Sequence, residues 1–211
     1  MLAKILTAIF RPIFFLLFPY RVIGRENIPA QGSGVKTVLC SNHTSMYDPI
    51  LLHIAQKRRI FFMAKEELFR NPITRWVLGG IFGGFPVARG AGDTTALDKA
   101  VSLAQSGELM GIFPEGTRSK DGSLGRFHSG AALIAARAGA NVLPVAISGK
   151  PRLFRRMTVS FGKLMTPEDL HLTDPDKPEL RHATRLMMAR IGEMLAEIRP
   201  QTPSVDEESA A

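Results

Sequence analysis

Short apolar runs alternate with amphipathic stretches along this chain of 211 residues. Runs rich in aliphatic and β-branched residues predict strands over residues 36–41, 60–64, 109–113, 142–148 and 157–161. Apolar positions at helical spacing predict helices over residues 49–56, 66–78, 94–105, 129–138 and 178–198. Strands that alternate with helices are typical of a sheet covered by helices. The pattern therefore predicts an α/β fold with a mixed central sheet flanked by helices.

The N-terminus is strongly apolar, but Lys4, Arg11, Pro12 and Pro19 interrupt it. A membrane-spanning helix needs about 20 predominantly apolar residues with few charges. No small-residue cleavage pattern follows, which argues against a signal peptide. Aromatic side chains mixed with cations suit a helical segment that lies in the headgroup region of a membrane. A helix packed on the protein's own core is the alternative.

Size and composition allow one sizeable core, because 45% of the residues are hydrophobic. We expect a membrane-associating helical segment over residues 1–34, an α/β domain over 35–199 and a disordered acidic tail over 200–211. The net charge of +8 points to an anionic partner: nucleic acid, an anionic membrane or a phosphorylated substrate. Cations at residues 57–59 flank an apolar run, so they suit either a membrane surface or a solvated face.

A histidine and an aspartate lie five residues apart in a loop that follows a predicted strand. The chain's one cysteine, Cys40, lies in that strand and is expected to be buried there, not to act as a nucleophile. His43 could take a proton from a hydroxyl while Asp48 fixes its tautomer, and Asp48 also suits the N-cap of the next helix. The same spacing recurs at His171 and Asp176, but no strand precedes that second pair.

Two other blocks of the chain carry candidate site residues. Functional residues in α/β sheets gather at the carboxyl ends of strands. Residues 83–90 bring Arg89 out of a glycine-rich approach, which suits either phosphate binding or a tight turn with a solvated arginine. Residues 113–118 offer an acid, a glycine, a hydroxyl and an arginine directly after an apolar strand. So dense a polar cluster indicates a binding site more than a surface turn.

Taken together, these blocks resemble a known family. In order and spacing they are similar to the four sequence blocks of the glycerolipid acyltransferases, and most similar to the bacterial 1-acylglycerol-3-phosphate acyltransferases. The resemblance is carried by Asn42-His43 with Asp48, by Gly84 with Arg89, by Phe113-Pro114-Glu115-Gly116-Thr117-Arg118, and by Val142-Leu143-Pro144-Val145. It covers residues 38–149, about half of the chain.

The resemblance implies a general-base mechanism. His43 would take the proton of the free hydroxyl of a lysophosphatidic acid as that hydroxyl attacks an acyl thioester, and Asp48 would orient the imidazole. The thioester would be that of acyl carrier protein or coenzyme A, as co-substrate, with no further cofactor and no metal. Backbone amides near His43 are the candidate donors for the tetrahedral oxyanion.

The resemblance also implies a site for the acceptor's phosphate. Arg89 and Arg118 would bind the phosphate, and Glu115, Gly116 and Thr117 would shape its site. Lys65, at the end of a predicted strand, is either a further phosphate contact or a plain surface lysine. The setting would be the cytoplasmic face of the cell membrane, with the protein peripheral or monotopic.

Other functions fit the sequence less well. Within the enzyme class, the acceptor could instead be glycerol-3-phosphate or another lysophospholipid. A metal-dependent phosphohydrolase would use His43, Asp48, Glu115 and His128, but the close two-histidine spacing of such sites is missing. A nucleic-acid-binding protein would interleave exposed aromatics with basic clusters. Here the aromatics lie in apolar runs, so we expect no nucleic-acid partner. A non-catalytic membrane scaffold has no need of the histidine–aspartate pair.

Overall fold

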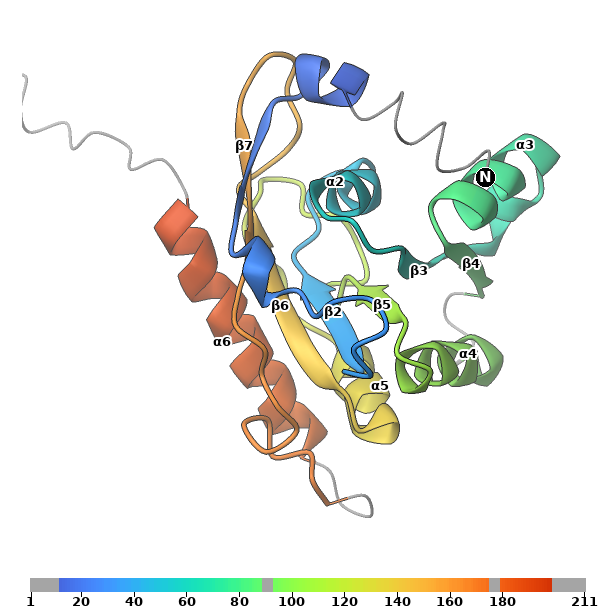
Figure 1. The fold of residues 1–211 in the computed structure, drawn as a ribbon, viewed down its shortest axis with the longest axis vertical. Coiled ribbons are helices and arrows are strands. Elements are labelled where there is room, and N and C mark those ends of the chain that lie inside the picture. Colours follow the sequence, from blue (N-terminus) through green and yellow to red (C-terminus); the bar gives the residue numbers. More distant parts are fainter. Residues whose placement is uncertain (1–11, 89–92, 175–178, 199–211) are drawn as a thin grey trace, which may run out of the picture.

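Seven strands form one sheet through the middle of the molecule (Figure 1). The structure is a computed structural model and describes residues 12–88, 93–174 and 179–198. The strands are β1 (Tyr20–Ile23), β2 (Thr37–Ser41), β3 (Ile60–Lys65), β4 (Gly84–Val87), β5 (Leu109–Ile112), β6 (Asn141–Ile147) and β7 (Met157–Phe161). Their order is β1-β7-β6-β2-β5-β3-β4, and neighbours are parallel except β6 and β7. The predicted mixed sheet of an α/β fold is therefore confirmed.

Helices cover both faces of this sheet (Figure 1). The longer ones are α2 (Asp48–Ala55), α4 (Thr94–Gln105), α5 (Gly130–Ala138) and α6 (Leu180–Ile198). Val38 and Cys40 of β2 pack in the cluster that α4, α5 and α6 cover, whereas Leu39 packs in the cluster under α2. A parallel strand that is buried on both sides reads as a continuous apolar run, which explains why β2 was predictable. The helix predicted at residues 178–198 is also confirmed as α6, and its apolar face packs on the core, since Met187 and Ile191 are buried.

The predicted helix over residues 66–78 is wrong. The structure breaks this stretch into three short pieces: the 3₁₀-helix η2 (Glu66–Phe69), α3 (Pro72–Arg75) and the π-helical η3 (Trp76–Ile81). The break falls at Asn71, whose backbone is extended because a proline follows it. Oδ1 of Asn71 accepts hydrogen bonds from the amides of Ile73 and Thr74, so a new helix begins there.

Two strands at the edges of the sheet were not predicted. β1 pairs in parallel with β7, so residues 20–23 belong to the sheet although we expected them in an N-terminal segment. β4 pairs with β3, and its residues therefore form a strand and not a tight turn. Pro86 has no amide hydrogen to donate, and an edge strand tolerates this. The 3₁₀-helix η1 (Arg25–Asn27) follows β1.

The described part of the N-terminal segment is partly packed and partly exposed. Residues 12–17 are helical, with Phe14 in the core beside α2 and Leu16 70% exposed. Within the described ranges, no helix combines the length and the apolar character needed to cross a bilayer. Residues 1–11 and the predicted tail over 200–211 lie outside these ranges.

One member of the basic cluster at residues 57–59 is part of the folded core, whereas Lys57 and Arg59 are exposed. Arg58 is buried, and its guanidinium donates hydrogen bonds to the carbonyl oxygens of Pro29 (2.8 Å) and Gly107 (2.7 Å). Burial lowers the pKa of Arg58, although Glu108 opposes this shift. The guanidinium of Arg59 lies 4.9 Å from the ring centre of Phe61. The expectation that this cluster meets a membrane or the solvent is therefore wrong for Arg58.

Candidate active site

The predicted site residues gather at one edge of the sheet. Strands β2, β3, β4, β5 and β6 all run in the same direction, so their carboxyl ends share that edge. Cys40 of β2 is aligned with Ile112 of β5, which brings the loops after these two strands together. Asn42 adds a link to β6, because its side chain both donates to the carbonyl of Ile147 and accepts from its amide. The predicted site residues therefore lie at the carboxyl ends of the strands, where functional residues of α/β sheets gather.

His43 and Asp48 form the predicted pair. Nδ1 of His43 lies 2.9 Å from Oδ2 of Asp48, and the histidine side chain is 16% exposed whereas the aspartate is fully buried. A carboxylate that accepts from Nδ1–H leaves the lone pair on Nε2. Nε2 can then accept a proton from a hydroxyl that reaches the exposed part of the ring.

Asp48 organises the loop in front of α2 and does not cap that helix. Its Oδ2 accepts hydrogen bonds from the amides of Thr44 (2.6 Å) and Ser45 (2.7 Å), which lie before it in the chain. The predicted N-cap role is wrong, since the capping position is Tyr47 and lacks a side-chain cap. Because the amides of Thr44 and Ser45 are bonded to Asp48, they are not free to stabilise an oxyanion.

Glu115 fixes the backbone of the same loop. Its Oε1 accepts a hydrogen bond of 2.7 Å from the amide of His43, and its Oε2 accepts one of 2.9 Å from the amide of Gly125. In return, the amide of Ser119 donates to the carbonyl of His43 at 2.8 Å. The amide of His43 is therefore also bonded, so the amides of His43, Thr44 and Ser45 are not free candidates for the oxyanion.

Two stacked phenylalanine rings lie against one face of the His43 imidazole. The ring of Phe113 lies 4.1 Å from that of His43 and nearly parallel to it, and Phe62 stacks on Phe113 at 5.3 Å. Two parallel rings fix the plane of the histidine, while Asp48 fixes its rotation within that plane. Cys40 lies in the core as predicted, where burial, aided by Glu115, raises the pKa of its thiol. A thiol in this state is a poor nucleophile.

The residues predicted to bind phosphate differ in their exposure and in their charged neighbours. Arg118 and Thr117 are exposed in the turn after β5, and Gly116 occupies the left-handed region there, with φ of 68°. Lys65 ends β3 and is half-exposed, with its Nζ 3.9 Å from a carboxylate oxygen of Glu67. Arg89 lies outside the described residues. The structure thus brings the turn of residues 116–118 to His43 but does not test the arginine after β4.

A cavity of about 340 Å³ opens beside this turn. It is lined by Glu115, Thr117, Ser119, Lys120, Asp121, Ser123, Gly125, Arg126 and His128. Lys120 and Arg126 were missed in the sequence because they lie beyond the block that ends at residue 118. No three side chains of the histidine, cysteine, aspartate and glutamate types gather as metal ligands within the described residues. The arrangement predicted for a metal-dependent hydrolase is therefore not formed.

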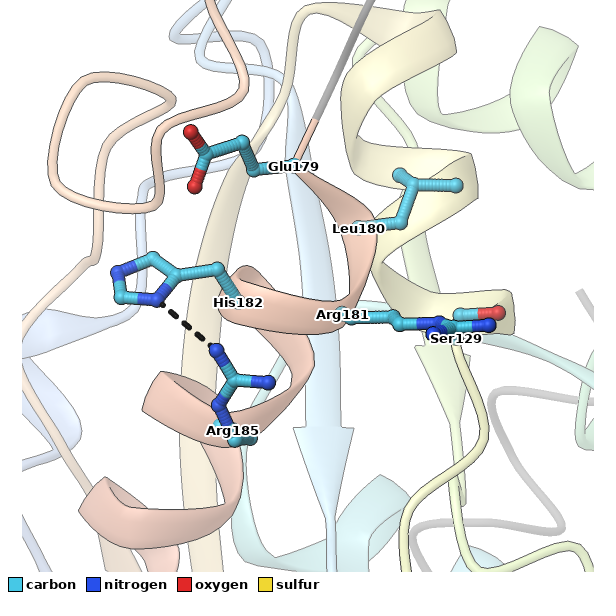
Figure 2. A pocket seen from close by; sticks show the side chains of 6 residues that line it. All are labelled: Ser129, Glu179, Leu180, Arg181, His182 and Arg185. Carbon is cyan, nitrogen blue, oxygen red and sulfur yellow. Dashed lines mark hydrogen bonds between the residues drawn. The ribbon is translucent and has the colours of Figure 1, made fainter.

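A second hollow, of about 500 Å³, lies at the start of α6. Figure 2 shows Arg181, His182 and Arg185 extending from the first turns of this helix, with His182 3.4 Å from Arg185. His171, of the alternative pair, packs edge-on against His182. Asp176 lies outside the described residues. None of the residues predicted for the active site lines this hollow.

Comparison with known proteins finds several acyltransferases that are similar to this chain. The model of a protein family described as acyltransferase matches residues 19–148. The 1-acyl-sn-glycerol-3-phosphate acyltransferase of Bacillus subtilis is 34% identical over 187 residues, which cover 82% of this chain and 87% of that protein. A chloroplastic 1-acyl-sn-glycerol-3-phosphate acyltransferase of Arabidopsis thaliana is 33% identical over 142 residues, or 65% of this chain. This match spans 39% of the plant protein's length.

A solved structure shows the same fold. The crystal structure of the 1-acyl-sn-glycerophosphate acyltransferase PlsC from Thermotoga maritima superposes with a TM-score of 0.70 and 25% sequence identity. The superposition covers 95% of this chain and 81% of the other. The family match begins at residue 19, so it includes β1 together with the whole edge that carries His43. The chain therefore belongs to the acyltransferase family.

Proposed function

We propose that this protein is a 1-acyl-sn-glycerol-3-phosphate acyltransferase. It would transfer a fatty acyl group from a thioester to the sn-2 hydroxyl of lysophosphatidic acid and give phosphatidic acid. The observation that carries the proposal is the partly exposed imidazole of His43, held by the buried Asp48 beside a cavity with basic side chains. The names of the relatives supply the substrate class.

In this mechanism His43 is the general base. Its Nε2 takes the proton of the acceptor hydroxyl while the hydroxyl oxygen attacks the thioester carbonyl, and the positive charge on the imidazole is stabilised by Asp48. The tetrahedral intermediate then collapses, the carbon–sulfur bond breaks, and the imidazolium returns the proton to the departing thiolate. No acyl-enzyme forms, and the step needs neither a metal nor a cofactor.

The acceptor's phosphate would lie at the turn after β5. Arg118 is exposed there and forms no ion pair within the part of the chain that the structure describes, so its guanidinium is available to an anion. Gly116 and Thr117 shape the turn, and Arg89 and Lys65 would add cations from the neighbouring strands. Glu115 would act on the site through the backbone of His43.

The donor and the setting complete the proposal. The thioester would come from acyl carrier protein or coenzyme A. The lysolipid acceptor resides in a membrane, so the protein would work at an anionic membrane surface on the cytoplasmic face, without crossing the bilayer. An acceptor such as glycerol-3-phosphate or another lysophospholipid is the alternative within the family.

A crossed assay with purified protein tests this function. Lysophosphatidic acid, glycerol-3-phosphate and lysophosphatidylcholine are each offered with acyl carrier protein and coenzyme A thioesters, and the acylated lipid is measured. We expect the highest kcat/KM with lysophosphatidic acid for at least one donor. Faster transfer to another acceptor with both donors would overturn the proposed substrate, and the absence of transfer to every acceptor would overturn the proposed reaction.

A further inference from the structure

Two apolar side chains stand at the tip of the loop between β6 and β7. Leu153 is 56% exposed and Phe154 is 66% exposed, and the backbone of Arg152 pairs with that of Arg155 just behind them. The tip is therefore an ordered two-residue turn. Because the loop follows β6, which is parallel to β2, it leaves the sheet at the same edge as the loop that carries His43.

The turn does not need these side chains in order to fold. Phe154 has φ of 57°, in the left-handed region that bulky residues rarely adopt. A glycine or an asparagine would make this turn with less strain. A phenylalanine that is both strained and exposed points to a partner outside the fold.

Cations surround the tip. Arg152, Arg155 and Arg156 are all exposed, and none of them forms an ion pair within the described ranges. With Leu153 and Phe154 they place three positive charges around two apolar groups. Arg58, by contrast, is buried and bonded within the fold, so its charge is not presented to a partner as those of the three loop arginines are.

The loop is joined to the N-terminal helix of residues 12–17. The amide of Phe154 donates a hydrogen bond of 2.8 Å to the carbonyl of Leu17, and Figure 1 shows the loop beside that helix at one end of the molecule. Phe15 and Leu16 of the helix are exposed as well. The apolar surface continues towards the active site, since the next residue, Phe18, stacks on Tyr47 in the loop that follows His43.

We propose that the loop of residues 148–156 and the helix of residues 12–17 form one docking surface for an anionic lipid bilayer. Leu153 and Phe154 insert among the acyl chains, and the three arginines lie among lipid phosphates. The inference rests on the proposed function in one respect, because docking brings the edge with His43 to a lipid substrate. An acidic carrier protein would match the arginines, but it would leave the continuous apolar surface unexplained.

Vesicle binding of paired variants tests the loop. Leu153→Ser with Phe154→Ser should lower partitioning onto phosphatidylcholine–phosphatidylglycerol vesicles about tenfold. Arg152→Gln, Arg155→Gln and Arg156→Gln together should lower it by up to about fivefold per residue, and salt should weaken binding of the wild type. The matched controls lie elsewhere on the surface: Ile23→Ser, and the triple change Lys163→Gln, Arg181→Gln and Arg185→Gln. Equal losses in controls and loop variants, or no loss in the loop variants, would overturn the proposal.

A tryptophan at the tip reports insertion without weakening it. Trp76 is the chain's one tryptophan, so Phe154→Trp in a Trp76→Phe background gives a single signal. Its emission should shift to the blue with anionic vesicles and should be quenched by lipids brominated along the acyl chain. An unchanged spectrum, or a response to acyl carrier protein but not to vesicles, would overturn membrane docking.

Activity on a soluble acceptor separates this proposal from the proposed function. The serine pair at residues 153 and 154 should retain transfer to a short-chain, monomeric lysophosphatidic acid while it loses transfer to the same headgroup in vesicles. Loss of both at once would contradict the docking role. A wild type that binds vesicles but acylates no acceptor would overturn the proposed reaction and leave the docking surface standing.

Discussion

The backbone amide of His43 donates a hydrogen bond of 2.7 Å to the carboxylate of Glu115, 72 residues further along the chain. Glu115 is buried, and its second oxygen accepts from the amide of Gly125. The side chain therefore joins the loop after β2 to the loop after β5. Its contacts indicate that it positions His43, which differs from the phosphate-site role implied by the family resemblance.

Glu115→Gln should lower kcat more than it raises KM for the acceptor. The glutamine has one oxygen where two amides need acceptors, so one buried amide loses its partner at a cost of about 1–3 kcal/mol. Steady-state kinetics and chemical denaturation measure the two effects. A rise in KM for the phosphorylated acceptor with unchanged kcat would return Glu115 to the phosphate site.

Arg118→Ala should act on the acceptor instead. The lost charge-assisted contact corresponds to about 1.5–3 kcal/mol, so KM for lysophosphatidic acid should rise roughly tenfold to a hundredfold while kcat falls less. Arg137→Ala is the control: Arg137 lies in α5 and forms an ion pair with Asp98, so this variant also loses an arginine but none of the residues assigned to the phosphate site. If the acceptor dependence of Arg118→Ala matches that of the control, Arg118 is not part of the phosphate site.

His53 should make stability depend on pH. It lies in α2 against Phe82, its Nδ1 has no hydrogen-bond partner among the described residues, and burial, aided by Arg59, lowers its pKa from 6.5 to about 4. The folded state therefore favours the neutral ring, whereas the unfolded chain takes up a proton below pH 6.5. The free energy of unfolding should therefore be highest above pH 6.5 and should fall by about 1–3 kcal/mol as the pH drops towards 4.

A substitution isolates that contribution. His53→Leu should lose less stability than the wild type between pH 7 and pH 4.5, as measured by urea denaturation at each pH. The half-buried His182, in α6, serves as the control through His182→Gln, which should keep the wild-type slope. Parallel pH profiles for wild type and His53→Leu would show that His53 is not the group responsible.

The sequence predicted the buried strands and the site blocks because each depends on local pattern. β2 is apolar on both faces, and the polar clusters directly follow β2 and β5. The edge strands β1 and β4 were not predicted, because each has only four residues and one neighbouring strand. So short a stretch shows little of the apolar pattern by which a strand is predicted. The helix break at Asn71 could have been predicted from Pro72, which follows it. Apolar residues at helical spacing on both sides of Asn71 instead indicated one continuous helix.

What the sequence could not show is how the loops hold one another. The bonds from Glu115 to His43 and from Asp48 to Thr44 and Ser45 depend on which side-chain oxygen faces which amide. These bonds occupy three of the backbone amides near His43 that were candidate donors for the oxyanion. The docking surface also required the structure, because it joins the tip at residues 153–154 to a helix more than a hundred residues earlier in the chain.

The rate of acyl transfer by His43→Ala decides whether His43 is the general base. With lysophosphatidic acid and a thioester donor, loss of the general base should lower kcat about 10²–10⁴-fold in a protein that still unfolds cooperatively. His171→Asn is the matched control, since His171 has φ of 54°, a backbone region that asparagine tolerates, and it should retain wild-type activity. A His43→Ala protein with a near wild-type rate, or a comparable loss in His171→Asn, would show that His43 is not the general base.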